Sequence, residues 1–254
     1  MTPAAALQGL PLDAARCIFE FAYLPAQYVD PERGAQLRPA ALDGLDMPVA
    51  QVSRAMVQTL GLPDLVGLDT VQPLHRAALL PRDAVRELAL WVGLRRASGA
   101  LRKLVLRQDV QALAEQVHDA HWSWVFSPNA APMPQAASTE LVLQQLAVTE
   151  WPKIIWQCGW DALVDICLVL PRSIGQRLWL KLPVQTPDVF ALATPALGTS
   201  EMQALTQAVA QAYDRFMPKP LHPAIRLMAA RLPVSHATMS LHFKANRFLR
   251  GLSP

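Results

Sequence analysis

The sequence is poor in the residues that typify several common classes of protein. Among its 254 residues there are only three Cys, three Tyr and 11 Gly. So little Gly and Tyr disfavours a β-sandwich or β-barrel. Cys17, Cys158 and Cys167 are odd in number and include no closely spaced pair, which argues against a disulfide framework or a zinc ribbon. We expect buried thiols in a reducing cytoplasm.

Long apolar runs are also missing. No stretch offers the roughly 18 uninterrupted apolar residues that a membrane span needs. The nearest candidate, residues 154–170, carries Asp161 and Asp165. The first residues, MTPAAALQGLPLDAARC, have neither the basic nor the apolar segment of a secretory signal. These absences predict a cytoplasmic protein without a membrane span.

The residues that are abundant favour helices. The chain is 52% hydrophobic and 17% charged, so it can bury a core, and Ala, Leu, Gln and Arg are good helix formers. Its 22 Pro are spread along the chain, where they can separate short helices. We predict an all-α fold in a single compact domain over residues 1–254, with roughly nine short to medium helices joined by proline-punctuated loops.

Apolar periodicity and end signals place these helices. The predicted ranges are 12–22, 48–60, two helices within 81–126 separated at Ser98 and Gly99, 139–149, 151–170, 171–182, 199–216, 221–232 and 235–249. The two helices within 81–126 are expected to pack as an antiparallel pair. Residues 24–48 are predicted to be an ordered loop. Residues 127–138 contain three Pro and no charge, so they are predicted to be an exposed loop.

The charge of the chain is unevenly distributed. The basic C-terminal element, residues 215–254, holds seven basic residues and no acidic one, although the net charge of the whole chain is only +3. Such polarity favours an acidic partner, an anionic surface or self-association. A solvated basic face on a terminal helix is the ordinary alternative.

Signatures of catalysis are scarce. The sequence has no GxGxxG, GxxxxGK[ST], GxSxG or CxxC motif, so we expect no cofactor and no metal. One constellation favours an enzyme: His118 and Asp119 are adjacent, as in the all-helical, metal-dependent phosphohydrolases of the HD superfamily. His75, with Asp161 or Asp165, would complete a ligand set. The ordinary alternative is a helix C-terminus where imidazoles meet free carbonyl groups.

Aromatic residues raise a further choice between core and binding site. Trp151, Trp156, Trp160 and Trp179 favour core packing over an aromatic pocket, because large aromatics are more often core. The opening stretch CIFEFAYLPAQYVDPERG, residues 17–34, predicts a core-anchored helix followed by a stiff proline-rich loop. That loop serves as a docking surface or as a strap over the core, and docking is favoured.

Three segments resemble the SctK (YscK-like) proteins of bacterial type III secretion systems. They are the stretches LPRDAVRELALWVGL and ALRKLVLRQDV in and around residues 81–107, GWDALVDICLVLPRSIGQRLWLKLP at residues 159–183, and the Phe21, Pro25, Tyr28, Pro31 pattern. The resemblance implies a non-enzymatic cytoplasmic adaptor of the sorting platform, lying at the inner membrane without spanning it. Such an adaptor links the cytoplasmic part of the SctD ring to the SctQ pods, which hold the SctL stator and the SctN ATPase.

Residue type and position, rather than the resemblance, suggest how partners would bind. We predict a docking hot spot of Phe21, Tyr28 and Arg33, since interface energy concentrates in aromatic and Arg anchors. The basic face would steer an acidic partner. Its predicted residues are Arg231, Lys244, Arg247 and Arg250. The alternatives are an HD-type phosphohydrolase using His75, His118 and Asp119, and a module that binds membrane or nucleic acid through the basic tail.

Overall fold

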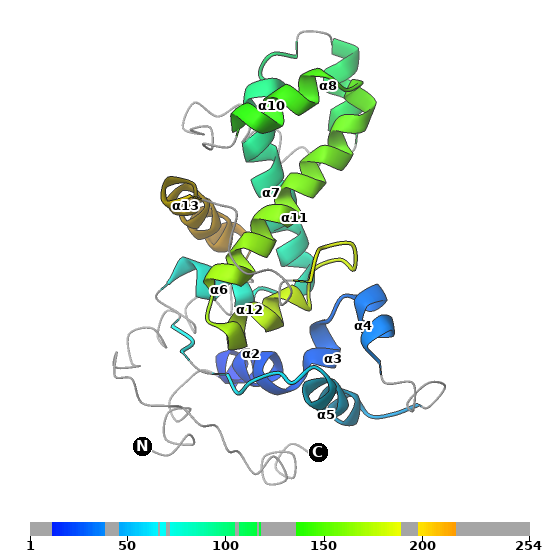
Figure 1. Cartoon of the computed structure of the whole chain (residues 1–254), viewed down its shortest axis with the longest axis vertical. Helices are drawn as coiled ribbons and strands as arrows, with labels where there is room; N and C mark the ends of the chain where they lie inside the picture. Colours follow the sequence, from blue (N-terminus) through cyan, green and yellow to red (C-terminus); the bar gives the residue numbers. More distant parts are fainter. Residues whose placement is uncertain are drawn as a thin grey trace.

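The computed structural model of the chain describes residues 12–38, 46–65, 67–69, 72–104, 107–115, 117, 136–188 and 198–216. Every regular element in those residues is a helix (Figure 1), which confirms the predicted all-α class. Within the same ranges, no helix combines the length and hydropathy that crossing a membrane requires. The prediction of one domain over the whole chain stays a prediction.

The helices follow one another through the chain as labelled in Figure 1. Their bounds are α2 (Leu12–Tyr23), α3 (Pro25–Tyr28), α4 (Pro31–Leu37), α5 (Val49–Thr59), α6 (Pro73–Leu79), α7 (Arg82–Leu101), α8 (Arg107–Ala114), α10 (Ala136–Gln144), the 3₁₀-helix η2 (Val148–Glu150), α11 (Trp151–Val169), α12 (Arg172–Trp179) and α13 (Thr199–Phe216).

Helices α7 and α11 form the central pair of the fold, and they lie side by side in Figure 1. They run antiparallel and touch through their backbones at two glycines. A Cβ atom at Gly93 would lie 2.0 Å from the carbonyl oxygen of Ile155, and one at Gly159 would lie 2.0 Å from that of Ala89. Because no residue with a side chain fits at either position, the two glycines set the distance between the helices.

The buried apolar side chains form two clusters, and α7 and α11 contribute to both. The first cluster also draws on α2, α6, α12 and α13, through residues such as Phe21, Leu79, Leu178 and Leu205. The second also draws on α8 and α10, through Leu113 and Leu143. The central pair therefore carries the packing at both of its ends.

The prediction of a loop over residues 24–48 is wrong for its first half, which holds two short helices. Pro25 and Pro31 each occupy the first turn of a helix, where the missing N–H of proline costs nothing. Asp30 is the N-cap of α4, and its Oδ1 accepts a hydrogen bond from the backbone N–H of Arg33. The prolines begin helices here instead of breaking them.

The predicted break at Ser98 and Gly99 is also wrong, because α7 continues through both residues to Leu101. Ser98 is buried, and a Cβ at Gly99 would lie 2.8 Å from the Glu140 carboxylate of α10. The small residues thus allow close packing against another helix. The expected pairing within 81–126 is not the main packing of α7, which lies chiefly against α11 and α10 and shares the second apolar cluster with Leu113 of α8.

Some of the other predicted helix boundaries are confirmed and others differ. The helices predicted at 151–170 and 199–216 are confirmed by α11 and α13. Helix α10 begins at Ala136, inside the predicted exposed loop 127–138, and ends five residues before the predicted end at 149. Residues 127–135 and the predicted helices at 221–232 and 235–249 lie outside the described residues.

We expect Gly159→Ala to lower the free energy of unfolding by about 3 kcal/mol, because its new methyl group meets the backbone of α7 and cannot be accommodated by a rotamer change. The matched control is Gly99→Ala on α7, whose methyl group meets only the end of the Glu140 side chain. That variant should stay within about 1 kcal/mol of the wild type. Urea denaturation measures both, and equal losses would contradict the backbone contact.

Candidate functional site

Three buried cations, Arg33, Arg177 and Lys181, form what we call the buried cationic cluster. Their side chains are only 3–4% exposed. Within the described residues, they donate hydrogen bonds to backbone carbonyl oxygens and to one threonine hydroxyl, and not to carboxylates. Their acceptors lie at helix ends and turns, where carbonyl groups lack partners within a helix.

Arg177 of α12 holds the C-terminal end of α2. Its Nε and Nη2 donate to the carbonyl oxygen of Ala22 at 3.3 and 3.0 Å. Its Nη1 donates to Pro63 at 2.9 Å and to Ser173 in its own helix at 2.7 Å. One guanidinium therefore ties the last turn of α2 and the segment after α5 to α12, and its charge complements the negative end of the α2 dipole.

Lys181 does the same for α6. Its Nζ donates to the carbonyl oxygens of Ala78 and Leu80, both at 2.7 Å. The Phe21 and Tyr28 rings lie 4.9 Å from the same nitrogen, so they offer their faces to its charge. Burial lowers the pKa of Lys181 to about 7, and the nearby Cys17 thiol opposes this effect. A neutral amine still has two N–H donors for the two carbonyl groups.

Arg33 fixes the turn that follows α12. Its Nε donates to the carbonyl oxygen of Leu182 at 3.0 Å, and its Nη2 donates to Pro183 and, at 2.7 Å, to the hydroxyl of Thr186. Its guanidinium also lies 3.8 Å from the centre of the Trp179 ring. The turn is therefore held to α4, which follows the opening helices of the chain.

Of the predicted docking hot spot, the structure buries the side chains of Phe21 and Arg33, and Tyr28 is half-buried. Phe21 is 2% exposed, and Arg33 belongs to the buried cationic cluster. The Tyr28 hydroxyl donates to the carbonyl oxygen of Phe21 at 2.9 Å, and the two rings stack. Buried side chains offer little contact area to a partner, so these contacts favour the strap over the docking surface. Arg231, Lys244, Arg247 and Arg250 lie outside the described residues.

The predicted metal ligands are only partly described. His75 is buried in α6, not in a connector, and its Nδ1 accepts the backbone N–H of Asp69 at 2.9 Å. Asp161 is exposed and accepts the Gln157 amide, whereas Asp165 is buried. His118 and Asp119 lie outside the described residues. Among the residues that are described, no three His, Cys, Asp or Glu gather as metal ligands would.

The three cysteines are free thiols. Cys167 is buried, and Cys17 and Cys158 are half-buried. Burial raises the pKa of each thiol, so none has the lowered pKa of a reactive cysteine.

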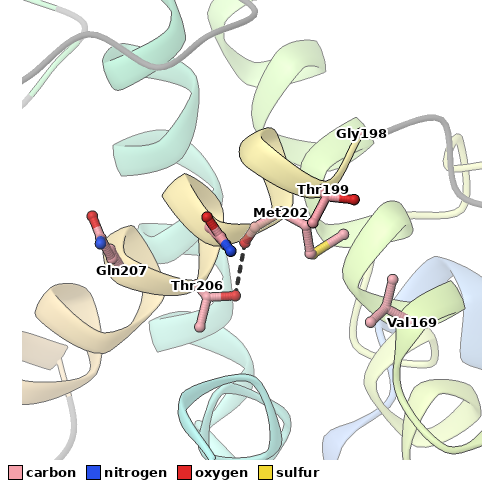
Figure 2. A pocket seen from close by; sticks show the side chains of 7 residues that line it. Val169, Gly198, Thr199, Met202, Thr206 and Gln207 are labelled. Carbon is pink, nitrogen blue, oxygen red and sulfur yellow. Dashed lines mark hydrogen bonds between the residues drawn. The ribbon is translucent and has the colours of Figure 1, made fainter.

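A groove of about 530 Å³ opens between the end of α11 and the start of α13. Figure 2 shows Met202 lying toward Val169 across it, with Thr206 donating a hydrogen bond to the Met202 carbonyl oxygen. Its other lining residues are Gly198, Thr199, Gln203 and Gln207. None of these side chains titrates, so the groove offers contact surface and no acid–base chemistry.

The four tryptophans singled out in the sequence, at positions 151, 156, 160 and 179, differ in burial. Trp151 and Trp179 are buried, as predicted, and each indole N–H donates to a backbone carbonyl oxygen, of Leu146 and Pro187 respectively. Trp156 and Trp160 are only half-buried and stack on each other with ring centres 5.6 Å apart.

An exposed cation covers this stack. The Arg86 guanidinium of α7 lies 5.4 Å from the centre of the Trp156 ring. We call Arg86, Trp156 and Trp160 the tryptophan shelf. Sequence reasoning overlooked Arg86, because it lies among other charged residues on α7 and no local pattern distinguishes it.

Arg177 and Lys181 lie near the end of the stretch at residues 159–183, and no sequence pattern gave either of them a role. A signal for their burial was present, since they flank the apolar residues Leu178, Trp179 and Leu180. Basic side chains inside an apolar segment are candidates for buried, hydrogen-bonded cations. Their acceptors, however, lie more than 100 residues away in the sequence.

Comparison of the chain with protein-family models, curated proteins and solved structures found no match.

Replacing Arg177 by Met should lower the free energy of unfolding by about 3 kcal/mol, because the substitution leaves buried carbonyl groups without a donor. Arg172→Met is the matched control, since Arg172 is exposed in the first turn of the same helix. Its effect should be within about 0.5 kcal/mol. Chemical denaturation distinguishes the two variants, and a small effect at Arg177 would contradict its role in holding α2.

Lys181 makes stability depend on pH. Between the lowered pKa of the folded state, about 7, and the ordinary pKa of 10.5, the unfolded chain binds more protons than the folded one. Stability should therefore rise with pH, by about 1 kcal/mol between pH 7 and 8. From about pH 8 upward the raised pKa values of the three thiols act in the opposite direction, because the thiols ionise first in the unfolded chain.

Urea denaturation at pH 7, 7.5 and 8 tests this expectation. In Lys181→Met the rise should disappear, whereas Arg172→Met should keep it. If the free energy of unfolding changes with pH equally in the wild type and in Lys181→Met, the lysine is not the source of the pH dependence.

Proposed function

We propose that the protein is a non-enzymatic adaptor of a bacterial type III secretion sorting platform. It links the cytoplasmic part of an SctD-type ring to SctQ-type pods at the cytoplasmic face of the inner membrane. The proposal begins from the SctK-like stretches in residues 17–34, 81–107 and 159–183.

The observation that supports the proposal most strongly is where those stretches lie in the fold. They supply α2 to α4, α7, the second half of α11 and α12, and of these α2, α4 and α12 are joined through the buried cationic cluster, by Arg33 and Arg177. The characteristic Arg177, Lys181 and Tyr28 all serve internal packing. A resemblance made of framework residues fits a scaffold that acts through its surfaces.

The described surface gives such a scaffold two separate places to bind. One is the groove between α11 and α13, and the other is the tryptophan shelf on α7 and α11. An adaptor that bridges a ring and a pod needs two separate contacts. The basic C-terminal element adds a positive charge that would speed association with an acidic partner.

Co-purification tests the proposal. The full chain is expressed with the SctQ-type pod protein and with the SctD-type cytoplasmic domain encoded near it, and each should co-purify with the chain. Exchanging Lys244, Arg247 and Arg250 for Glu should weaken one of the two contacts and make it less sensitive to salt.

The control exchanges Arg16, Arg54 and Arg172 for Glu, since these are exposed arginines elsewhere on the surface. That variant should bind as the wild type does. Failure to bind either partner, or stoichiometric manganese, iron or zinc in the purified protein, would contradict the adaptor. The metal result would favour the HD-type phosphohydrolase instead.

A further inference from the structure

We propose that the tryptophan shelf is the docking surface for an acidic, aliphatic segment of a partner protein. The inference rests on the proposed function only in that the occupant is a protein partner, and it adds the place and the chemistry of one contact. Three properties of the shelf carry it: unsatisfied indole donors, an unpaired positive charge and a rigid base.

The indole donors distinguish the shelf from the core tryptophans. Trp151 and Trp179 each donate their N–H to a carbonyl oxygen of their own chain. Within the described residues, the indole nitrogens of Trp156 and Trp160 donate no hydrogen bond, and neither is buried without a partner. Half-exposed tryptophans with available donors are the typical anchors of protein interfaces.

The charge of the shelf selects the partner. Arg86 is exposed and has no ion pair within the described part of the chain. Lys153 precedes Trp156 by three positions, so it lies on the same face of α11, and it too is exposed and unpaired among the described residues. Asp161, an exposed carboxylate of α11, accepts the Gln157 amide at 2.8 Å and keeps its charge, but it follows Trp156 by five positions and so lies off the face that carries Lys153 and Trp156. On α7, the exposed Asp83 pairs with Arg82 at 3.6 Å. The charge left on the shelf is positive, and it complements an acidic segment.

The base of the shelf is rigid. Trp160 adjoins Gly159, where the backbones of α7 and α11 touch, so the two helices that carry the shelf cannot slide past each other. A preorganised surface loses little entropy when it binds. The two indoles stack on each other and are half-exposed, so the part of them that Arg86 leaves open offers an apolar surface that suits aliphatic side chains.

Site-specific photo-cross-linking tests the docking surface in the full chain, in cells that express it with its own gene neighbours. A photoreactive phenylalanine replaces Gln157, which is exposed between the two tryptophans on α11. In the control, the photoreactive phenylalanine replaces Gln27, which is exposed on α3. We expect an adduct from position 157, not from position 27, and mass spectrometry should map it to a protein segment rich in Asp or Glu and aliphatic residues.

Charge reversal tests the chemistry of the contact. Arg86→Glu should lower the yield of the adduct at least tenfold. Arg102→Glu, at the exposed other end of α7, should leave the yield within about twofold, because it lies roughly 24 Å from Arg86 along the helix. Changing the mapped acidic residue of the partner to Lys should restore the adduct of Arg86→Glu.

Several outcomes would overturn the docking surface: no adduct at position 157, an adduct with a second copy of the chain, an adduct with nucleic acid, or an adduct that Arg86→Glu leaves unchanged. The result also separates this inference from the proposed function. An adduct with an acidic segment of a protein other than the SctQ and SctD types supports the shelf and contradicts the adaptor. Co-purification of those partners without an adduct at position 157 supports the adaptor and overturns the shelf.

Discussion

The C-terminal ends of α2 and α6 depend on cations that the chain supplies much later in its sequence. Arg177 follows its acceptor Ala22 by 155 residues, and Lys181 follows its acceptor Ala78 by 103. Carbonyl groups at a helix end are unsatisfied and lie at the negative end of the helix dipole, so burying them without a donor is costly. A buried cation with no acceptor would be more costly still. The buried cations satisfy the carbonyl groups, and the carbonyl groups satisfy the cations. The opening helices are therefore bound to α12 by hydrogen bonds that neither element could form without the other.

A second constraint orients the rest of the molecule. Gly93 and Gly159 let the backbones of α7 and α11 touch, and this rigid pair extends through both apolar clusters. The buried cationic cluster lies toward one end of the pair, while α8 and α10 pack at the other end (Figure 1). The interior is thus devoted to holding helices together. A partner would have to bind the surface, where the structure offers the groove beside α13 and the tryptophan shelf.

How much of this could be predicted depended on whether the signal was local. Helices α11 and α13 were predicted well, because their apolar periodicity is long and bounded by clear end signals. Helices α3 and α4 were missed, because Pro25 and Pro31 were interpreted as loop residues although proline also begins helices. The burial of Arg33 had no local signal: arginine is usually exposed, and its acceptors lie about 150 residues away. For the same reason the docking hot spot was placed on side chains that are internal, whereas the exposed cation of the shelf, Arg86, was overlooked.

The central claim is that the buried cationic cluster joins the opening helices and α12 into one cooperative unit. Hydrogen exchange of the native full-length protein, followed amide by amide in low concentrations of denaturant, tests it most directly. The amides in the last turns of α2 and α6 should exchange with the same free energy and the same denaturant dependence as those of α12, because they can open only together. Exchange of α2 and α6 through a separate opening of lower free energy, with α12 still protected, would contradict the claim.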